Sequence, residues 1–412
     1  MKACAKCQRL FGDEGAFCPI DGTGLRPVGE VQVPGDPKDP RIGGRLCGAR
    51  YQVRRVIADG GMGRVYQAYD TQDARSVALK VLHEEVADDE VAVERFKREF
   101  SFSAQLPHQH IVEVLDFKRT EDRSYALVME YLEGEELRMT LKREKVLPPE
   151  RVIRIVAQLA IGLDEAHRRN VVHRDIKPDN VFLCGTPEGD LVKLLDFGSV
   201  RDNSEGAKKL TVLGTTIGSP FYMSPEQAQG LRELDHRADV WSVAAIAYEC
   251  LTGKVPFTGP SGPAILLAIL SKEPEPPSIA GKANGVPAEL DDVISDALSK
   301  DMKTRTQSLG ELADRVGAAY GLGGGAADWA EMPESELKAA IELARTSPPL
   351  PEHMLTPSTA PAAGPGAPNP GAISEGEDFV MGLPSGPPWG LIAAVAAIVV
   401  VTVGLILYLV LR

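Results

Sequence analysis

The sequence has little positive charge, no internal repeat and no apolar stretch at its N-terminus. Lys and Arg number 45 against 58 Asp and Glu, and the net charge is −13 at pH 7. This balance argues against nucleic acid as a partner, because nucleic-acid-binding domains are usually basic. No segment of 20–50 residues recurs, so a solenoid or a propeller is excluded. Residues 1–24 are polar and lack the apolar stretch of a signal peptide, so none is expected.

What is present is an ordinary globular composition with two unusual segments. Hydrophobic residues make up 43% and charged residues 25%, which excludes a wholly disordered or fibrous protein. Residues 321–388 hold 12 of the 31 prolines and supply −7 of the net charge of −13. We divide the chain into a cysteine-containing segment (1–24), a Pro/Gly-rich linker (25–49), a compact domain (50–317), an acidic Pro/Ala/Gly-rich tether (318–388) and an apolar segment (389–411).

The apolar periodicity of the compact domain predicts strands first and helices later. Alternating or continuous apolar runs predict strands over 51–57, 65–69, 76–82 and 125–129. Positions spaced at three and four predict helices over 94–106, 151–168 and 239–251. This order favours an α+β fold with two lobes. A short apolar stripe over 334–345 predicts a helix in the tether that either docks on the kinase or a partner or forms only transiently, and we favour the transient helix.

Two short patterns in the first lobe suggest phosphate handling. Residues 58–66 read ADGGMGRVY between two predicted strands, and glycine lets backbone N–H groups approach a phosphate closely. Alone, this run is as well explained by a plain hairpin turn. Lys80 lies on a predicted strand, where an ammonium needs a partner, and Glu99 in the next helix is a candidate. Alone, such a pair is more often a solvated surface pair.

Three further motifs follow in a fixed order: HRDIKPDN at 173–180, LDFG at 195–198 and SPE at 224–226. With the glycine-rich loop and Lys80, this set resembles the eukaryotic-type serine/threonine protein kinases, and most of all their bacterial branch. The resemblance covers residues 51–316. It implies the two-lobed protein-kinase-like fold and ATP-dependent phosphorylation of protein Ser and Thr hydroxyls. The alternative is a pseudokinase scaffold that acts through nucleotide binding and the N-terminal segment.

The resemblance assigns a role to each motif residue. Lys80 would hold the α- and β-phosphates and Glu99 would hold Lys80, while Asp196 and Asn180 would bind Mg²⁺ or Mn²⁺. Asp175 would orient the substrate hydroxyl and accept its proton, and Lys177 would neutralise the transferred phosphoryl group. His173 would support the loop without acting as a base. The residues expected at the nucleotide are Ala58, Gly60, Gly63, Val65, Ala78, Lys80, Glu130, Leu132, Asn180 and Asp196.

Ala58 departs from the family pattern, which has glycine at this position, so we expect altered nucleotide affinity rather than inactivity. Glu226 and Arg305 match a buried ion pair that braces the large lobe of the family.

Regulation by phosphorylation is also implied. In the family, the arginine at the position of Arg174 pairs with a phosphate on the activation loop. Here that loop contains Thr211, Thr215 and Thr216. We therefore expect autophosphorylation at one or more of these threonines, with a homodimer as its possible setting.

The N-terminal cysteines have metal-ligand spacing. Cys4 and Cys7 are followed by Cys18, and Asp21 stands where a zinc ribbon would have its fourth cysteine. Three thiolates and one carboxylate can complete a zinc site, which would stabilise a segment too short to bury a core. Unmetallated thiols remain the alternative. A disulfide is disfavoured because a kinase needs cytosolic ATP, where thiols stay reduced.

The apolar segment predicts a single transmembrane helix. Residues 390–411 carry no charge, and at about 1.5 Å per residue a helix of this length crosses a bilayer core of about 30 Å. Because the kinase domain must meet ATP, we expect it in the cytoplasm, anchored to the plasma or inner membrane.

Overall fold

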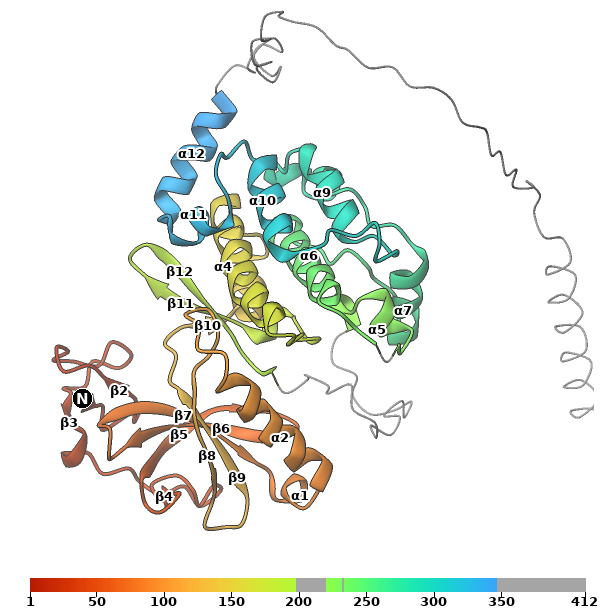
Figure 1. The fold of residues 1–412 in the computed structure, drawn as a ribbon. Coiled ribbons are helices and arrows are strands. Elements are labelled where there is room, and N and C mark those ends of the chain that lie inside the picture. Colours follow the sequence, from red (N-terminus) through yellow and green to blue (C-terminus); the bar gives the residue numbers. More distant parts are fainter. Residues whose placement is uncertain (198–219, 232, 347–412) are drawn as a thin grey trace, which may run out of the picture. The chain divides into compact units, whose positions relative to one another are not determined.

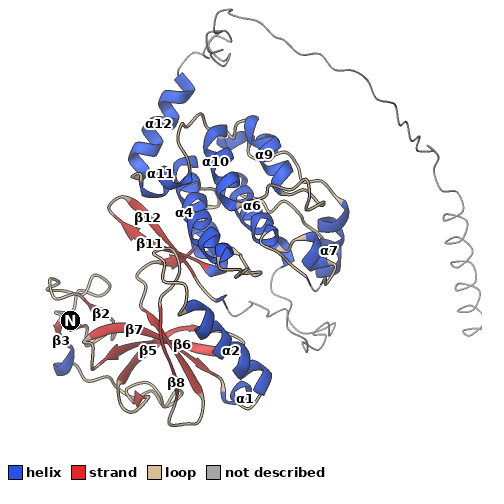
Figure 2. Cartoon of the chain, in the orientation of Figure 1, coloured by secondary structure: helices blue, strands red, loops and turns tan. Residues whose placement is uncertain are grey.

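The computed structural model describes residues 1–197, 220–231 and 233–346, which all belong to one compact unit. Strands dominate the first part of this unit and helices the second, as Figure 2 shows. The expected two-lobed α+β architecture is therefore present (Figure 1). The threonines of the activation loop, most of the tether and the segment 389–411 lie outside the described residues.

The small lobe is built on a six-stranded antiparallel sheet with the order β4-β5-β6-β7-β9-β8. The strands are β4 (Arg45–Leu46), β5 (Tyr51–Asp59), β6 (Gly63–Asp70), β7 (Arg75–Leu82), β8 (Val114–Arg119) and β9 (Tyr125–Glu130). One face buries a cluster that includes Tyr51, Tyr66 and Leu79. The other face packs Leu82 and Leu127 against Phe96 of α2 (Glu90–Ser103), which the short helix α1 (Glu84–Ala87) precedes. The four predicted strands and the predicted helix after β7 are thus confirmed.

The segment predicted as a linker over 25–49 is instead part of the small lobe. It contains β3 (Arg26–Pro27), the 3-10 helix η1 (Val28–Glu30) and β4, and β3 joins β1 (Lys2–Ala3) and β2 (Leu10–Phe11) in a small sheet. Asp39 is buried and accepts hydrogen bonds from Arg64 Nη1 and Tyr66 Oη, both at 2.8 Å. The Pro/Gly content therefore marks an irregular segment, residues 31–44, which we call the strap. It has no helical or strand periodicity, and polar contacts of Asp39 fix it to the sheet.

The large lobe surrounds two long helices. In α4 (Pro149–Arg168) a proline at the first turn opens the helix and the face with Val156 and Leu163 is buried. In α6 (Arg237–Thr252) almost every residue is buried, and Gly253 ends the helix in the left-handed conformation with φ 75°. Both helices contribute to one large core cluster. The predicted helices over 151–168 and 239–251 are confirmed.

Shorter elements complete the large lobe. The hairpin β11 (Val181–Thr186) and β12 (Gly189–Leu194) pairs with β10 (Glu135–Glu136). Further helices of this lobe are α3 (Leu137–Glu144), η2 (Pro178–Asn180), η4 (Pro220–Tyr222), α5 (Pro225–Ala228), α7 (Gly262–Ser271), α8 (Pro277–Ala280), η5 (Lys282–Asn284), α9 (Glu289–Ala297) and α10 (Leu309–Ala319).

The compact body extends beyond the boundary predicted at residue 317. Helices α11 (Ala326–Glu331) and α12 (Glu334–Thr346) pack on the large lobe, and Trp329, Leu337 and Ile341 belong to its core cluster. Figure 1 shows both helices beside α4. The transient helix expected at 334–345 is therefore a docked helix, because its apolar stripe meets α4.

Candidate active site

Lys80 is the charged centre of the site. It lies on β7, and its Nζ lies 3.0 and 3.1 Å from the two carboxylate oxygens of Glu99 on α2. The same Nζ donates to Asp196 Oδ1 at 2.9 Å, from the segment after β12. The predicted Lys80–Glu99 pair is thus present, and its buried setting excludes a solvated surface pair.

The electrostatics of this cluster follow from one cation facing two acids. Burial alone would lower the pKa of Lys80, but the two carboxylates outweigh it and raise the pKa above its usual range. Burial raises the pKa of Glu99. Lys80 opposes this shift but does not cancel it, because the ammonium is shared with Asp196. Burial would also raise the pKa of Asp196, yet Lys80 holds it well below its usual range. Asp196 therefore stays ionised, as a ligand for a divalent cation must.

The register of the sheet brings three of the residues expected at the nucleotide onto one face, together with Met129. Val65 of β6 lies opposite Lys80, and Met129 of β9 lies opposite Ala78. Residues two apart on a strand share a face, so the side chains of Val65, Ala78, Lys80 and Met129 lie on the same side of the sheet. This arrangement gives an apolar surface beside the ammonium, suited to a flat heterocycle that carries phosphates.

The glycine-rich run forms the hairpin between β5 and β6, closed by a hydrogen bond from Gly60 N to Gly63 O at 3.1 Å. A Cβ at Gly63 would lie 2.4 Å from Val81 O, so close packing against β7 requires this glycine. Gly61 has no atom within 4 Å of a Cβ position, so nothing packs on the tip. His83 Nε2 lies 2.9 Å from Gly60 O, a tether for the hairpin that the motif gave no reason to expect.

The last residue of β9, Glu130, and Leu132 just beyond the strand are two of the residues expected at the nucleotide. The Glu130 N–H donates to Glu113 O at 3.0 Å, and the Glu130 carboxylate accepts from Lys193 Nζ at 2.6 Å. Any backbone contact of Glu130 with a base would therefore use its carbonyl oxygen. Leu132, the other expected contact, is half-buried.

The catalytic-loop residues converge on Asp175. Lys177 Nζ lies 2.7 Å from Asp175 Oδ2, and Asn180 Nδ2 donates to the Asp175 backbone oxygen at 2.7 Å. The side chain of Asp175 is 41% exposed, so a substrate hydroxyl has access to its carboxylate. Asp175, Lys177 and Asn180 are therefore brought together as predicted.

Asp239 at the start of α6 binds the backbone of the catalytic loop. Its buried carboxylate accepts from His173 N at 2.9 Å and from Arg174 N at 2.8 Å, and Arg174 has φ 66°. His173 Nε2 lies 2.9 Å from Leu195 O, and its ring packs on Phe197, which supports the predicted structural role for His173. Sequence reasoning missed this role: it predicted a buried helix from residue 239 onward and assigned no function to Asp239, although an acid at the start of an otherwise apolar helix was a signal in the sequence.

Two further predicted residues have described partners. Arg305 forms a bidentate pair with Glu226, with N–O distances of 2.7 and 2.9 Å, and both side chains are buried. This confirms the expected brace of the large lobe. Arg174 Nη2 donates to Leu234 O at 3.3 Å. Its expected partners Thr211, Thr215 and Thr216 lie outside the described residues.

The fit of Mg²⁺ follows from the donor set. Asp196 offers an ionised carboxylate, and Asn180 offers an amide oxygen while its nitrogen is bound to Asp175. Carboxylate and amide oxygens are the hard ligands that this ion takes. The residues present therefore fit the metal that the resemblance implies.

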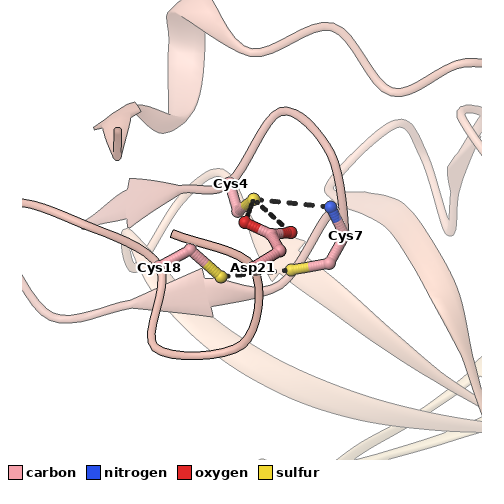
Figure 3. Close-up of side chains that lie close together, drawn as sticks. All are labelled: Cys4, Cys7, Cys18 and Asp21. Atoms are coloured by element: carbon pink, nitrogen blue, oxygen red, sulfur yellow. Dashed lines mark hydrogen bonds between the residues drawn. The ribbon is translucent and has the colours of Figure 1, made fainter. Parts of the chain in front are cut away.

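The N-terminal cysteines form a second cluster. The ligand atoms of Cys4, Cys7, Cys18 and Asp21 all lie within 4.8 Å of one another (Figure 3). The Cys7 and Cys18 sulfurs are 3.6 Å apart, and the Cys4 sulfur lies 3.5 and 3.4 Å from the Asp21 oxygens. A tetrahedron with Zn–S of about 2.3 Å and Zn–O of about 2.0 Å has edges of roughly 3.8 Å between sulfurs and 3.5 Å from sulfur to oxygen. These separations fit such a site.

The fold and the first site together define a protein kinase. The chain matches the model of the protein kinase domain family over residues 51–314, and it belongs to that family. It is 38% identical to serine/threonine-protein kinase pkn3 of Myxococcus xanthus over 268 residues, which cover 64% of this chain and 49% of that relative. It is 36% identical to serine/threonine-protein kinase PknB of Mycobacterium tuberculosis over 271 residues, which cover 65% of this chain and 42% of that relative. The chain thus spans less than half the length of these two curated relatives.

Solved structures agree with this family. A crystal structure of the M. tuberculosis PknI kinase domain matches with a TM-score of 0.51 and 30% sequence identity, and the match covers 66% of this chain and 97% of that one.

Proposed function

We propose that this protein is an ATP-dependent serine/threonine protein kinase. The observation that carries the proposal is the triple contact of Lys80 with Glu99 and Asp196, which unites β7, α2 and the segment after β12. Phosphoryl transfer depends on positioning and charge neutralisation, and this cluster supplies both at one point.

Each residue contributes a separate part of the transfer. Lys80 binds the phosphates of ATP and is oriented by Glu99. Asp196 and Asn180 would hold Mg²⁺ or Mn²⁺, and the bound ion would supply positive charge beside the phosphates. Asp175 accepts the proton of the substrate Ser or Thr hydroxyl, and Lys177, 2.7 Å from its carboxylate, stabilises charge on the transferred group.

The competing function is a pseudokinase scaffold. A phosphate-transfer assay with one variant distinguishes an active kinase from such a scaffold. Asp175→Asn keeps the shape of the loop but removes the base, so we expect transfer of radiolabelled phosphate to fall by about 10²–10⁴-fold. Asp296→Asn, whose exposed carboxylate pairs with Arg315 on the surface, is the matched control and should transfer normally. Equal, background incorporation by wild type and both variants would favour the scaffold.

Autophosphorylation and dimerisation are parts of the same proposal. Arg174 lies directly before Asp175, and phosphate on Thr211, Thr215 or Thr216 would carry negative charge and acceptor oxygens that suit a guanidinium. Mass spectrometry after incubation with Mg-ATP should find phosphate on at least one of the three. The Asp175→Asn variant should not phosphorylate itself. If transfer occurs between two copies, this variant should nevertheless gain phosphate on its loop when it is mixed with wild type. An unmodified loop in an active kinase would contradict autophosphorylation.

The membrane location also remains a proposal. The uncharged run over 390–411 supports a single membrane-spanning helix, with the kinase domain in the cytoplasm. Among the helices of residues 1–197, 220–231 and 233–346, none combines the length and apolarity that a bilayer span requires.

A structural zinc ion in the N-terminal cluster is the last part. Three thiolates and the Asp21 carboxylate would close a four-coordinate site of the structural type. Metal analysis of the purified full chain should give about one zinc per chain, with loss in Asp21→Asn and retention in the control Asp13→Asn. Zinc well below one equivalent in wild type would contradict the site.

A further inference from the structure

The turn that carries two of the cluster's cysteines also carries Gln8, the residue that touches the kinase sheet. Gln8 directly follows Cys7 and has φ 61°, a left-handed conformation unusual for a side chain other than glycine. Its N–H donates to Cys4 O at 3.0 Å, and its Nε2 donates to Ala5 O at 2.7 Å. The conformation of Gln8 is therefore fixed by the turn from Cys4 to Cys7, which a bound metal would close.

Arg54 of β5 is the partner of Gln8 across the boundary with the small lobe. Its Nε donates to Gln8 O at 3.3 Å and its Nη2 donates to Gln8 Oε1 at 3.2 Å. The residue is 1% exposed, and no carboxylate in the described part of the chain pairs with it. A buried cation needs hydrogen-bond partners, and here Gln8 supplies those two acceptors. If the turn lost its shape, the guanidinium would have to regain water or move.

Arg54 also occupies an irregular point of the strand that leads to the nucleotide hairpin. The pairing of β5 with β6 shifts register between Val53 and Arg55, and again between Val56 and Ala58. Such bulges turn a side chain out of the regular alternation and increase the local twist. The first shift thus directs Arg54 toward Gln8, and the second lies just before the glycine-rich turn.

The second strand of the hairpin is held by the same N-terminal region. Arg64, next to Gly63, pairs with Asp39 of the strap at 2.8 Å and also pairs with Asp59 at the other end of the turn. Tyr69 of β6 packs on the apolar cluster of Ala3, Leu10, Val28 and Val31. Both strands of the hairpin therefore contact the N-terminal region that carries the proposed metal site.

We propose that metal occupancy of the Cys4–Cys7–Cys18–Asp21 site sets the ATP affinity of the kinase, with Arg54 as the positioning residue that transmits it. The inference rests on the proposed zinc site and kinase function. In the metal-bound form, the turn keeps Gln8 against Arg54 and the hairpin in register. In the metal-free form, the turn loosens, Arg54 loses its acceptors and the hairpin positions phosphates less well. The chemical class of effector is zinc, a cation that three thiolates and a carboxylate suit.

The test compares ATP affinity in zinc-loaded and zinc-depleted full chain. Zinc is removed with a zinc-selective chelator, Mg²⁺ is kept constant, and the KM for ATP, kcat and the Kd of a fluorescent ATP analogue are measured. We expect KM and Kd to rise by roughly five-fold on depletion, the lower end of typical coupling between sites, with a smaller change in kcat. Re-addition of zinc should restore both values.

Arg54→Met tests the route of the effect without touching a metal ligand. This variant should keep its zinc, show the raised KM already when loaded, and no longer respond to depletion. The matched control Arg45→Met removes an exposed arginine from β4 of the same sheet and should respond like wild type. Thermal unfolding of each sample shows whether the kinase body is still folded.

Different results would contradict the zinc site, the effect of zinc on ATP affinity, or the route through Arg54. Wild type that binds no zinc would overturn this inference and the zinc site, while the kinase activity stands. Zinc-loaded and depleted wild type with equal KM and Kd would overturn the inference alone. An Arg54→Met protein that responds to depletion as strongly as wild type would overturn the assigned route. Because the analogue's Kd needs no phosphoryl transfer, loss of kinase activity would leave the inference testable.

Discussion

At the scale of single residues, the site depends on one ammonium shared between two acids. Glu99 holds Lys80 on one side, and Asp196 competes for it on the other. Without the two hydrogen bonds to the Glu99 side chain, Lys80 would be held by Asp196 alone, which is the carboxylate proposed to bind the metal ion. In the proposed mechanism, Glu99 therefore keeps Lys80 available for phosphate.

Glu99→Gln should lower kcat/KM for ATP by at least about ten-fold, which corresponds to roughly 1.4 kcal/mol of transition-state stabilisation. Because Asp196 still pairs with Lys80, the midpoint of thermal unfolding should change far less than activity. Glu94→Gln, on the same helix and with an exposed pair to Lys97, is the control and should leave both unchanged. A Glu99→Gln enzyme with unaltered kcat/KM would contradict this role.

His167 gives the kinase a pH-dependent contribution to stability. Burial alone would lower its pKa, but contacts with Asp164 and Asp239 raise the pKa from 6.5 to about 9. Since the folded pKa lies above the unfolded one, the stabilisation is complete below about pH 6.5 and is lost as pH rises to about 9. At about 1.4 kcal/mol per unit, it amounts to at most roughly 3 kcal/mol.

The comparison that isolates this group is denaturant unfolding of wild type and His167→Gln at pH 6 and pH 9.5. Wild type should be more stable than the variant at pH 6 by about 2–3 kcal/mol, and the gap should shrink at pH 9.5. A gap that is the same at both pH values would show that His167 is not charged in the folded protein.

At the scale of elements, the regular part of the fold was predictable and the irregular part was not. Strands β5, β6, β7 and β9 and helices α4 and α6 each bury a face or a run that leaves a periodic signal in the sequence. The strap around Asp39 leaves none, because polar contacts to Arg64 and Tyr66 fix it. The same limit applies to His83 and Arg54, whose partners are distant in the sequence and whose roles follow only from register and burial.

The docking of α11 depends on a tertiary match that the tether's composition concealed. Trp329 is 1% exposed, and its ring lies so close to Gly317 of α10 that a Cβ there would come within 2.3 Å of it. The bulky ring therefore packs directly on the backbone of a neighbouring helix. A Pro- and Gly-rich stretch gives no sign of this, because only the folded large lobe presents the glycine.

Trp329→Ala should destabilise the kinase by about 3–5 kcal/mol, the usual cost of deleting a large buried aromatic side chain. Leu267→Ala on α7, where the side chain is 63% exposed, is the comparison and should cost far less. Urea unfolding of the purified chain measures both. A loss below about 1 kcal/mol for Trp329→Ala would mean that α11 adds little to the body.

At the scale of the whole molecule, the proposed catalytic residues and the proposed membrane anchor lie in different parts of the chain. Every residue placed in the active site lies between Ala58 and Asp196, inside the body that ends at Thr346. The apolar run over 390–411 begins more than 40 residues later, and the intervening sequence is rich in Pro, Ala and Gly. The length and composition of this intervening sequence support the proposal that the anchor is separable from the catalytic machinery.

Two arginines in the apolar run test this separation at constant chain length. Val399→Arg with Val401→Arg would each oppose membrane insertion by roughly 2.5–3.5 kcal/mol at a helix centre. The wild-type chain should remain in the membrane pellet after alkaline carbonate extraction, and the double variant should move to the supernatant. Ala362→Arg with Ala367→Arg in the tether is the matched control and should stay in the pellet. Because the active site is untouched, kcat for a soluble peptide should be equal in all three proteins.

A wild-type chain that carbonate extracts completely would contradict the membrane span. Loss of peptide kinase activity in the double variant alone would contradict the independence of anchor and site.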